Sequence, residues 1–252
     1  MKPFLRWLGL LVAAFLALQL FFVARIATMA VIDPQSTAFE RSEAWRVLTD
    51  SPALHWRQQW MPYAQISEKL KLAVIASEDD GFVNHDGVDW DALEKAWQKN
   101  AKAEAQAAKT QAIKPAATIS AKPKPAARPP KIIGGSTITQ QLAKNLFLSG
   151  ERTFVRKGQE FVLTLLLEAL LNKERILEIY LNSVEWGDGV FGAEAAAQHY
   201  FYKSAAKLSS IEAARLAVML PRPKFFEKLP NSSYIAGRAN VIARRMADAE
   251  LP

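Results

Sequence analysis

The pattern of hydrophobic and polar positions is most uneven near the N-terminus, where residues 7–24 are apolar except for Gln19. A helix that spans a membrane needs about 20 mostly apolar residues, and this stretch, which residues 26–32 can extend, reaches that length. The apolar core of a cleaved signal peptide is shorter, about 7–15 residues, so an uncleaved anchor is favoured and a signal peptide is the alternative. Lys2 and Arg6 precede the stretch, which predicts a cytoplasmic N-terminus and an outer location for the rest of the chain.

Beyond the anchor, apolar residues recur with the spacing of helices, and no stretch alternates with period two over a useful length. Residues 161–171 are nearly all apolar but span only about half a membrane thickness, which predicts a buried core helix. Residues 185–192 contain three glycines and predict a loop rather than a strand. Further helices are predicted at 66–77, 90–99, 173–182, 193–202, 211–220 and 235–246. The predicted fold class is therefore mostly α.

These patterns divide the chain into three parts. Residues 1–32 are a cytoplasmic tip and transmembrane anchor, residues 33–64 a juxtamembrane segment, and residues 65–252 a helical domain. In the juxtamembrane segment, Trp45, Trp56 and Trp60 either rest at the membrane interface or pack on the domain.

A low-complexity segment of alanine, lysine and proline at 101–131 interrupts the domain. It cannot bury enough apolar surface to offset the entropy of ordering, which predicts a disordered insertion. Its first part, to about Gln111, has the alternative of extending the helix before it.

The formal charge of +7 lies in this region, because residues 99–131 hold eight basic residues and one acidic residue, while the remainder has 24 of each. A nucleic-acid-binding domain normally carries its basic patch on the folded surface, so no nucleic-acid partner is expected. The chain has no cysteine, and its three histidines have no H-x-x-x-H spacing. Disulfides and thiolate metal sites are excluded, and no zinc site is predicted.

Two polar stretches are candidates for chemistry. Glu78-Asp79-Asp80 directly follows an apolar helix, where a carboxylate is costly to bury unless it has a task. Burial raises carboxyl pKa values, which is one way to make a general base. A solvated acidic loop is the alternative.

The second stretch is 134–160, which begins with two glycines and continues with Ser136 and Thr137 as candidate helix caps. Thr137 and Gln140 have the spacing of a capping box, and a helix start with free N–H groups suits an anionic ligand. Cations and amides gather around one carboxylate, with Arg156 and Glu160 on one helix face; the set is Gln140, Gln141, Lys144, Asn145, Arg152, Arg156, Lys157 and Glu160. This set suits a phosphate-bearing substrate, and the alternative is a pair of solvated, charged helices.

Five blocks of sequence occur in a fixed order: Glu78-Asp79-x-x-Phe82-x-x-His85-x-Gly87-x-Asp89, Gly134-Gly-Ser-Thr-Ile-Thr-Gln-Gln-Leu-x-Lys144-Asn145, Arg156-Lys157-x-x-Glu160, Lys173-x-x-Ile176-Leu177-x-x-Tyr180-Leu181-Asn182 and Gly187-x-Gly189-x-x-Gly192. Together they resemble the peptidoglycan glycosyltransferases (glycosyltransferase family 51), which include the glycosyltransferase domain of class A penicillin-binding proteins. The resemblance covers roughly residues 56–246. It fits the short, membrane-anchored monofunctional transglycosylases of Gram-negative bacteria, because the chain has no room for a transpeptidase domain.

The resemblance implies a lysozyme-like helical glycosyltransferase domain that polymerises lipid II into β-1,4-linked strands, with inversion and release of undecaprenyl diphosphate. It implies that Glu78 is the general base and that Glu160, Lys144 and Arg152 lie around the donor's sugar and diphosphate. The other substrate-binding residues implied are Ser136, Thr137, Gln140, Gln141, Asn145, Phe82 and Arg156. The implied location is the bacterial inner membrane, with a single span and a periplasmic catalytic domain.

The expected partners are lipid II, the glycan linked to undecaprenyl diphosphate and membrane lipids, with other cell-wall synthesis proteins left open. No cofactor is expected to be required; a divalent cation, Mg²⁺ or Mn²⁺, between Glu160 and the diphosphate is left open. The family often has Ser-Lys where this chain has Asn172-Lys173, a cap position. The basic insertion is interpreted as a solvated tether, with contact to anionic lipid or to a partner protein as the alternative.

Two other functions compete with this interpretation. A lysozyme or lytic transglycosylase also uses two carboxylates, although it has no need of the cationic cluster. A non-catalytic cell-wall scaffold is the second alternative.

Overall fold

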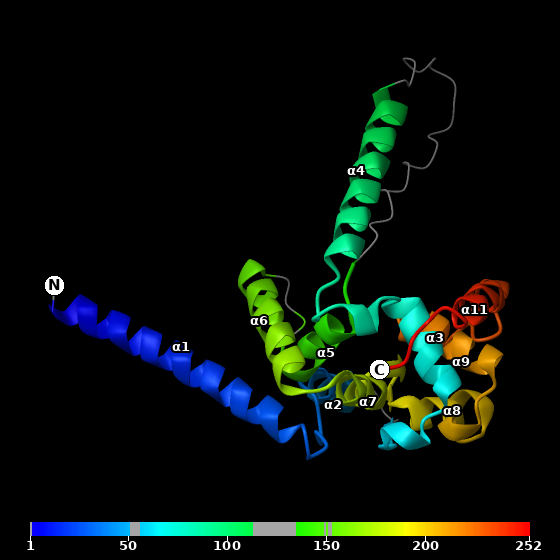
Figure 1. The fold of residues 1–252 in the computed structure, drawn as a ribbon, viewed down its shortest axis with the longest axis horizontal. Helices are drawn as coiled ribbons and strands as arrows, with labels where there is room; N and C mark the ends of the chain where they lie inside the picture. Colours follow the sequence, from blue (N-terminus) through cyan, green and yellow to red (C-terminus); the bar gives the residue numbers. More distant parts are fainter. Residues whose placement is uncertain (1, 51–55, 113–134, 149, 151–152) are drawn as a thin grey trace. The chain divides into compact units, whose positions relative to one another are not determined.

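The computed structural model describes residues 2–50, 56–112, 135–148, 150 and 153–252 (Figure 1). Its helices confirm the mostly α class: α1 (Lys2–Thr28), α2 (Ala38–Asp50), α3 (Glu68–Glu78), α4 (Trp90–Ala112), α5 (Ile138–Phe147), α6 (Phe154–Leu170), α7 (Lys173–Ser183), α8 (Ala193–Phe201), α9 (Ser210–Met219), α10 (Pro223–Phe226) and α11 (Ser233–Arg245). Three short 3-10 turns lie at Tyr63–Gln65, Phe82–Asn84 and Ala205–Lys207.

The chain forms two compact units. The larger unit is Met1–Val88 with Thr137–Pro252, and the smaller unit is Asp89–Ser136. The smaller unit contains α4, whose start is capped by Asp89 Oδ1, which accepts the N–H of Ala92 at 2.8 Å. Because α4 runs to Ala112, the prediction of disorder is wrong for residues 101–112, and the alternative of a helix extension is confirmed there. Residues 113–131 of the predicted insertion lie outside the described residues.

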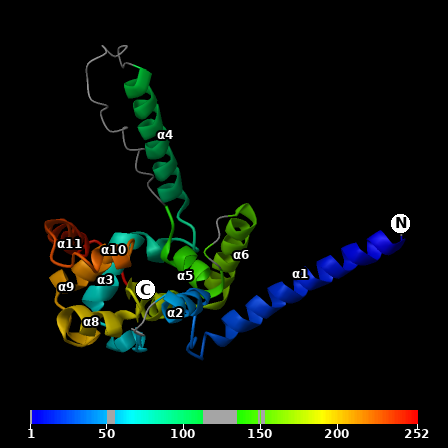
Figure 2. The ribbon, with the colours of Figure 1, turned by 180° about the vertical axis from the view of Figure 1, so that it is seen from behind.

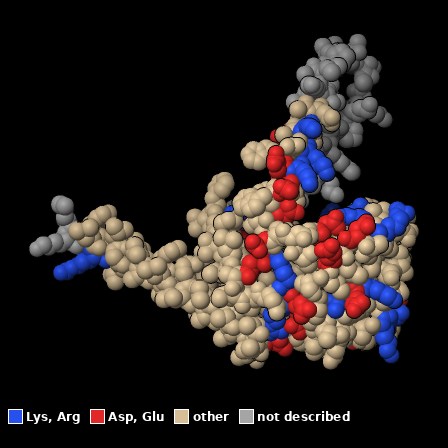
Figure 3. All heavy atoms as spheres, viewed as in Figure 1, with Lys and Arg blue, Asp and Glu red and all other residues tan. Residues whose placement is uncertain are grey.

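Helix α1 is, within the described ranges, the one helix long and apolar enough to cross a membrane. Figure 3 shows its surface almost free of charge along its length, as the sequence pattern predicted. Its C-terminal end packs on the domain, since Ile26 is fully buried and the rings of Phe22 and Phe147 meet edge to face at 5.4 Å. Helix α1 therefore continues into the helical core rather than into a free linker.

The juxtamembrane segment contains α2, a helix that the sequence analysis did not predict. Thr37 and Glu40 form a capping box at its start, with Glu40 Oε2 accepting the N–H of Thr37 at 2.7 Å and Thr37 Oγ1 accepting that of Glu40 at 3.0 Å. Trp56 stacks on Phe191 with ring centroids 4.6 Å apart, and Trp60 packs against the core. The packed alternative is thus confirmed for these two tryptophans, whereas Trp45 remains exposed.

The core lies among α3, α5, α7, α9 and α11. Helices α3, α9 and α11 contact one another and lie together in both ribbon views (Figures 1 and 2). Helix α7 begins at the predicted cap, where Asn172 Oδ1 accepts the N–H of Arg175 at 2.8 Å. Its buried residues extend around the helix and include Ile176, Leu177, Ile179, Tyr180 and Leu181. Burial of these apolar side chains is the main source of stability for a helix this short.

Helix α6 agrees only in part with the buried core helix predicted at 161–171. Leu163 and Leu167 are fully buried, but Phe161, Val162 and Leu165 are each more than a third exposed. Helix α6 contacts α5, α1 and α7. A nearly continuous run of apolar residues in this helix therefore did not mean that every one of them is buried.

A small sheet replaces the loop predicted at 185–192. Strands β2 (Glu185–Gly187) and β3 (Val190–Phe191) pair antiparallel, and β1 (Arg57–Gln58) pairs parallel with β3. Gly189, between the two antiparallel strands, has a φ of 72°, a conformation that glycine adopts at no steric cost. Strands of two or three residues are too short to show alternation, which is why the sequence pattern missed them.

Candidate active site

Glu78 is the last residue of α3, at the end of a helix whose preceding residues, Ala73 to Ala76, are fully or almost fully buried. Burial raises the pKa of its carboxyl group, and the negative charge of Asp79 raises it further. Hydrogen bonds from Gln141 and Ser77 act in the opposite direction. The pKa of Glu78 is therefore shifted upward, as expected for a general base, because a raised pKa gives the carboxylate a greater affinity for a proton.

Asp79 links this residue to α5. Its Oδ2 accepts the backbone N–H of Ile138 at 2.9 Å, and its Oδ1 lies 2.8 Å from His85 Nε2. The predicted capping box is confirmed, since Thr137 Oγ1 accepts the N–H of Gln140 and Gln140 Oε1 accepts that of Thr137. The N–H of Gln140 is occupied as the capping box predicts, and the N–H of Ile138 is occupied by Asp79, so the expectation of free N–H groups at this helix start is wrong for Ile138.

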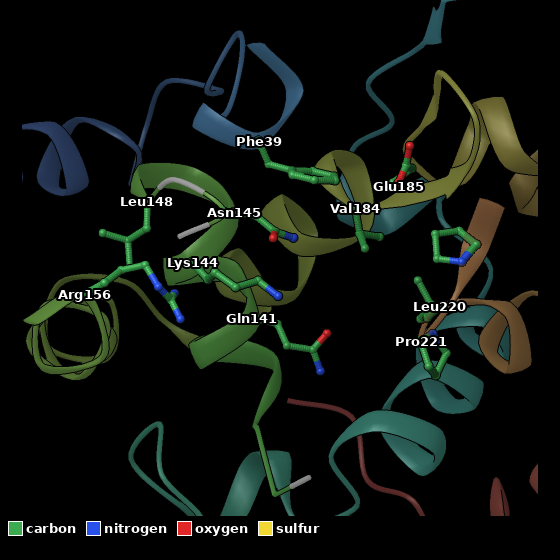
Figure 4. A pocket seen from close by; sticks show the side chains of 12 residues that line it. Phe39, Gln141, Lys144, Asn145, Leu148, Arg156, Val184, Glu185, Leu220 and Pro221 are labelled. Carbon is green, nitrogen blue, oxygen red and sulfur yellow. The ribbon is translucent and has the colours of Figure 1, made fainter. Parts of the chain in front are cut away.

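Gln141 connects Glu78 to a cavity. Its Nε2 donates to Glu78 Oε2 at 3.1 Å, and its side chain also lines a cavity of about 490 Å³. In Figure 4, Lys144 of α5 and Arg156 of α6 stand on one side of this cavity, and Val184 and Glu185 on the other. The remaining lining residues are Phe39, Asn145, Leu148, Gly150, Leu220, Pro221 and Pro223.

The cationic side of the cavity is built around Glu160, which is almost fully buried. Arg156 Nη1 donates to Glu160 Oε2 at 3.0 Å, and Lys157 Nζ donates to Glu160 Oε1. The pKa of Lys144 is lowered, mainly because its side chain is partly buried. The charge of Glu160 acts in the opposite direction, and the charges of Arg156 and Lys157 lower the pKa further. Three cations around one carboxylate leave an excess of positive charge, which an anionic group can offset.

The structure brings together most of the predicted site residues, but some have structural contacts. Thr137 is almost fully buried, and its Oγ1 donates to the carbonyl of Gly87 at 2.6 Å. Phe82 is completely buried under the ammonium of Lys173, which lies 4.6 Å from the ring centroid, so its ring offers no surface to a ligand in this conformation. Ser136 belongs to the smaller unit, and Arg152 lies outside the described residues.

A polar network behind the site has no local signal in the sequence. Lys173 Nζ donates to the carbonyl of His85 at 2.6 Å and to Glu168 Oε1 at 2.9 Å. The same Glu168 oxygen accepts from Thr139 Oγ1 at 2.6 Å. This network joins the loop after Glu78 to α5, α6 and α7. Lys173 is the first residue of one of the five sequence blocks, but its hydrogen bonds become apparent only in the folded structure.

The residues around Glu160 do not fit a divalent cation in this conformation, because each carboxylate oxygen already accepts from a cation. Among the described side chains, Glu43, Glu185 and Asp188 have carboxylate oxygens close enough together to share an ion. The ammonium of Lys224 pairs with all three of them. That ammonium already supplies the positive charge that an ion would bring.

The chain is similar in sequence to one described protein family and to several named bacterial proteins. The sequence profile of a family described as "Transglycosylase" matches residues 51–110 and 106–247. A protein of Burkholderia thailandensis named "Biosynthetic peptidoglycan transglycosylase" is 53% identical over 251 residues, which cover 98% of this chain and 88% of that protein. Proteins of the same name from Paraburkholderia xenovorans and Burkholderia pseudomallei are each 51% identical, again over 98% of this chain and over 94% and 88% of their own lengths.

Proposed function

This chain belongs to the transglycosylase family, and on that premise we propose that it polymerises lipid II into β-1,4-linked glycan strands. It is a peptidoglycan glycosyltransferase, like the relatives named for peptidoglycan biosynthesis. The observation that carries the proposed mechanism is the position of Gln141. Its side chain borders both the carboxylate of Glu78 and the cavity that Lys144 and Arg156 line.

In the proposed step, the 4-hydroxyl of the acceptor sugar attacks the anomeric carbon of the donor. Glu78 takes the hydroxyl proton, the new carbon–oxygen bond forms, and the bond to the diphosphate breaks with its electron pair on the departing oxygen. The α-linked leaving group and the β-linked product require inversion. Burial of Glu78 supports its assignment as the base, because it raises the pKa of the carboxyl group.

The cations of the cavity stabilise the leaving group in this proposal. Charge develops on the diphosphate as its bond to the sugar breaks, and fixed positive groups lower the free energy of that transition state. Lys144 and Arg156 line the cavity, and Arg156 is held by Glu160, which also accepts from Lys157. Asn145 and Gln141 add amide groups that suit sugar hydroxyls.

We further propose that α1 anchors the chain in the bacterial inner membrane with a cytoplasmic N-terminus and a periplasmic catalytic domain. The length and apolar surface of α1 support a span, and Lys2 and Arg6 at its start support this direction. An anchored enzyme meets lipid II in the membrane, where the undecaprenyl chain of the substrate is held.

The test compares Glu78→Gln with wild-type protein on two substrates, lipid II and finished peptidoglycan. Wild-type protein is expected to form polymer from lipid II and no fragments from peptidoglycan, and Glu78→Gln is expected to form neither. Glu40→Gln is the matched control, because burial also raises the pKa of Glu40, to about 7, and glutamine preserves its capping box. Fragments from peptidoglycan would identify a glycan-cleaving enzyme, and polymer from Glu78→Gln would remove the base assignment.

A further inference from the structure

Three side chains from different helices form a chain of hydrogen bonds that ends at Glu78. The hydroxyl of Tyr180 on α7 donates to Gln141 Oε1 at 3.0 Å, and Gln141 Nε2 on α5 donates to Glu78 Oε2 at 3.1 Å. Tyr180 is completely buried, whereas Gln141 lines the cavity. The phenol therefore reaches the reacting region only through the amide.

The chemistry of these groups fixes the direction of both hydrogen bonds. An ionised carboxylate accepts hydrogen bonds and has none to donate, so it requires the NH₂ end of the amide. The carbonyl end of the amide then faces the phenol, which must donate its proton. The carboxylate thus sets which end of the amide faces it, and the phenol, which can donate or accept, holds the other end in place.

We propose that Tyr180 is a positioning residue for the general base, which holds the amide of Gln141 with its N–H directed at the Glu78 carboxylate. This inference rests on the proposed function of Glu78 as the base. Tyr180 does not touch the substrate in this arrangement, and its effect passes through Gln141.

The consequence is control over the protonation of the base. Burial raises the pKa of Glu78, and the hydrogen bond from Gln141 is the larger of the two hydrogen-bond effects that lower it. An amide that is not held at its carbonyl end donates less well to the carboxylate, so the pKa of Glu78 rises and less of it is in the form that acts as a base. Tyr180 itself stays a donor, because burial and the charges of Glu78 and Asp79 raise its pKa well above 10.

Other charged and polar groups lie next to Glu78 in the sequence and are common to every variant of the test. Asp79 raises the pKa of Glu78 and is paired with His85. Asp80 is paired with Arg245 of α11 at 3.0 Å. Ser77 Oγ lies 3.4 Å from Glu78 Oε1. None of these contacts includes Tyr180, so its removal leaves them in place.

The experiment measures the pH dependence of kcat/KM for lipid II polymerisation by the full-length protein with Tyr180→Phe. The acidic limb of the profile is expected to move to higher pH by roughly one unit, because the amide of Gln141, without its partner, donates less well to the charged form of Glu78. Activity is expected to recover as the pH is raised. Tyr200→Phe is the matched control, because the hydroxyl of Tyr200 donates to the carbonyl of Trp186 at 2.8 Å, away from this chain of hydrogen bonds.

The Tyr200→Phe profile is expected to coincide with that of the wild type. An unshifted limb in Tyr180→Phe, or an equal shift in both tyrosine variants, overturns the inference. Gln141→Met removes both hydrogen-bonding ends of the amide and leaves the phenol in place. Its acidic limb is expected at higher pH than that of the wild type, and adding Tyr180→Phe is expected to shift it no further. An unshifted limb in Gln141→Met overturns the inference, whether or not Tyr180→Phe folds. A wild-type protein that forms no polymer, or an active Glu78→Gln, would instead refute the proposed function.

Discussion

The carboxylate of Asp79 accepts the backbone N–H of Ile138 at 2.9 Å, which fastens the residue after Glu78 to the first residue of α5. These two residues are 59 positions apart in the sequence, on either side of α4. The bond places a negative charge at the N-terminus of the helix that carries Gln141 and Lys144. It thereby fixes the distance between the proposed base and the proposed diphosphate site.

Replacement of Asp79 by alanine is expected to lower thermal stability. A hydrogen bond to a charged group contributes about 1.5–3 kcal/mol, and a carboxylate at a helix start about 0.3–1 kcal/mol. For a chain of this size, the Tm should fall by roughly 5 °C, measured in detergent by calorimetry. Asp80→Ala is the comparison, because the side chain of Asp80 is 59% exposed and its ion pair with Arg245 lies at the surface. Equal losses in the two variants would contradict this account of Asp79.

Replacement of Lys144 by methionine is expected to slow the chemical step. Removing one fixed group that stabilises transition-state charge costs about 10²–10³ in kcat. Lys69→Met, on the exposed side of α3, is the control and should retain wild-type kinetics. Steady-state kinetics with lipid II separate the outcomes. A rise in KM with an unchanged kcat would show that Lys144 binds the substrate without acting on the leaving group.

The activity of the wild-type protein should fall with decreasing pH at a higher pH than an ordinary glutamate would give. Glu78 acts as a base only when it is ionised, and burial raises its pKa above the usual value of about 4.3. A profile of kcat/KM against pH for lipid II measures the position of this limb. A limb at the ordinary glutamate value would show that the carboxyl group is more hydrated in the working enzyme than in the structure.

Local patterns in the sequence predicted the helices and their caps well. Thr137 with Gln140, and Asn172 before α7, are signals contained within four residues, and the structure has both caps. Helix α2 was missed because its hydrophobic periodicity is weak, although Thr37 and Glu40 have the spacing of a capping box.

What the sequence could not supply is contact across the fold. Asp79 is next to Glu78 in the sequence, but its bond to Ile138 appears only when α3 meets α5. The same limit explains Phe82, which the motif suggested as a substrate contact and which is buried beneath Lys173. It also explains Tyr180, whose hydroxyl meets Gln141 from another helix. A motif indicates which residues belong together, and the packing decides which of them face the cavity.

Removal of divalent cations is expected to leave polymerisation unchanged. Both oxygens of Glu160 accept from Arg156 and Lys157, so the carboxylate is already neutralised by the protein. The measurement is the rate of lipid II polymerisation after dialysis against EDTA, with and without added Mg²⁺ or Mn²⁺. A loss of activity that only the metal restores would show that an ion takes over the contacts of Glu160 when substrate is bound.

Glu212 should make a pH-dependent contribution to the stability of the fold. Burial by itself would raise its pKa, but hydrogen bonds from Lys203 and Ser209 outweigh burial and lower it to about 2. A carboxyl group with a depressed pKa in the folded state stabilises the fold above its unfolded pKa of about 4.3, and this contribution is lost as the pH falls towards 2. Glu212→Gln keeps the capping box with Ser209 but cannot ionise. The Tm of the wild type should therefore exceed that of Glu212→Gln near neutral pH and approach it in acid. Glu250→Gln, at an exposed position near the C-terminus, is the control, and its Tm should follow that of the wild type at every pH. A difference between wild type and Glu212→Gln that stays constant with pH would refute the depressed pKa.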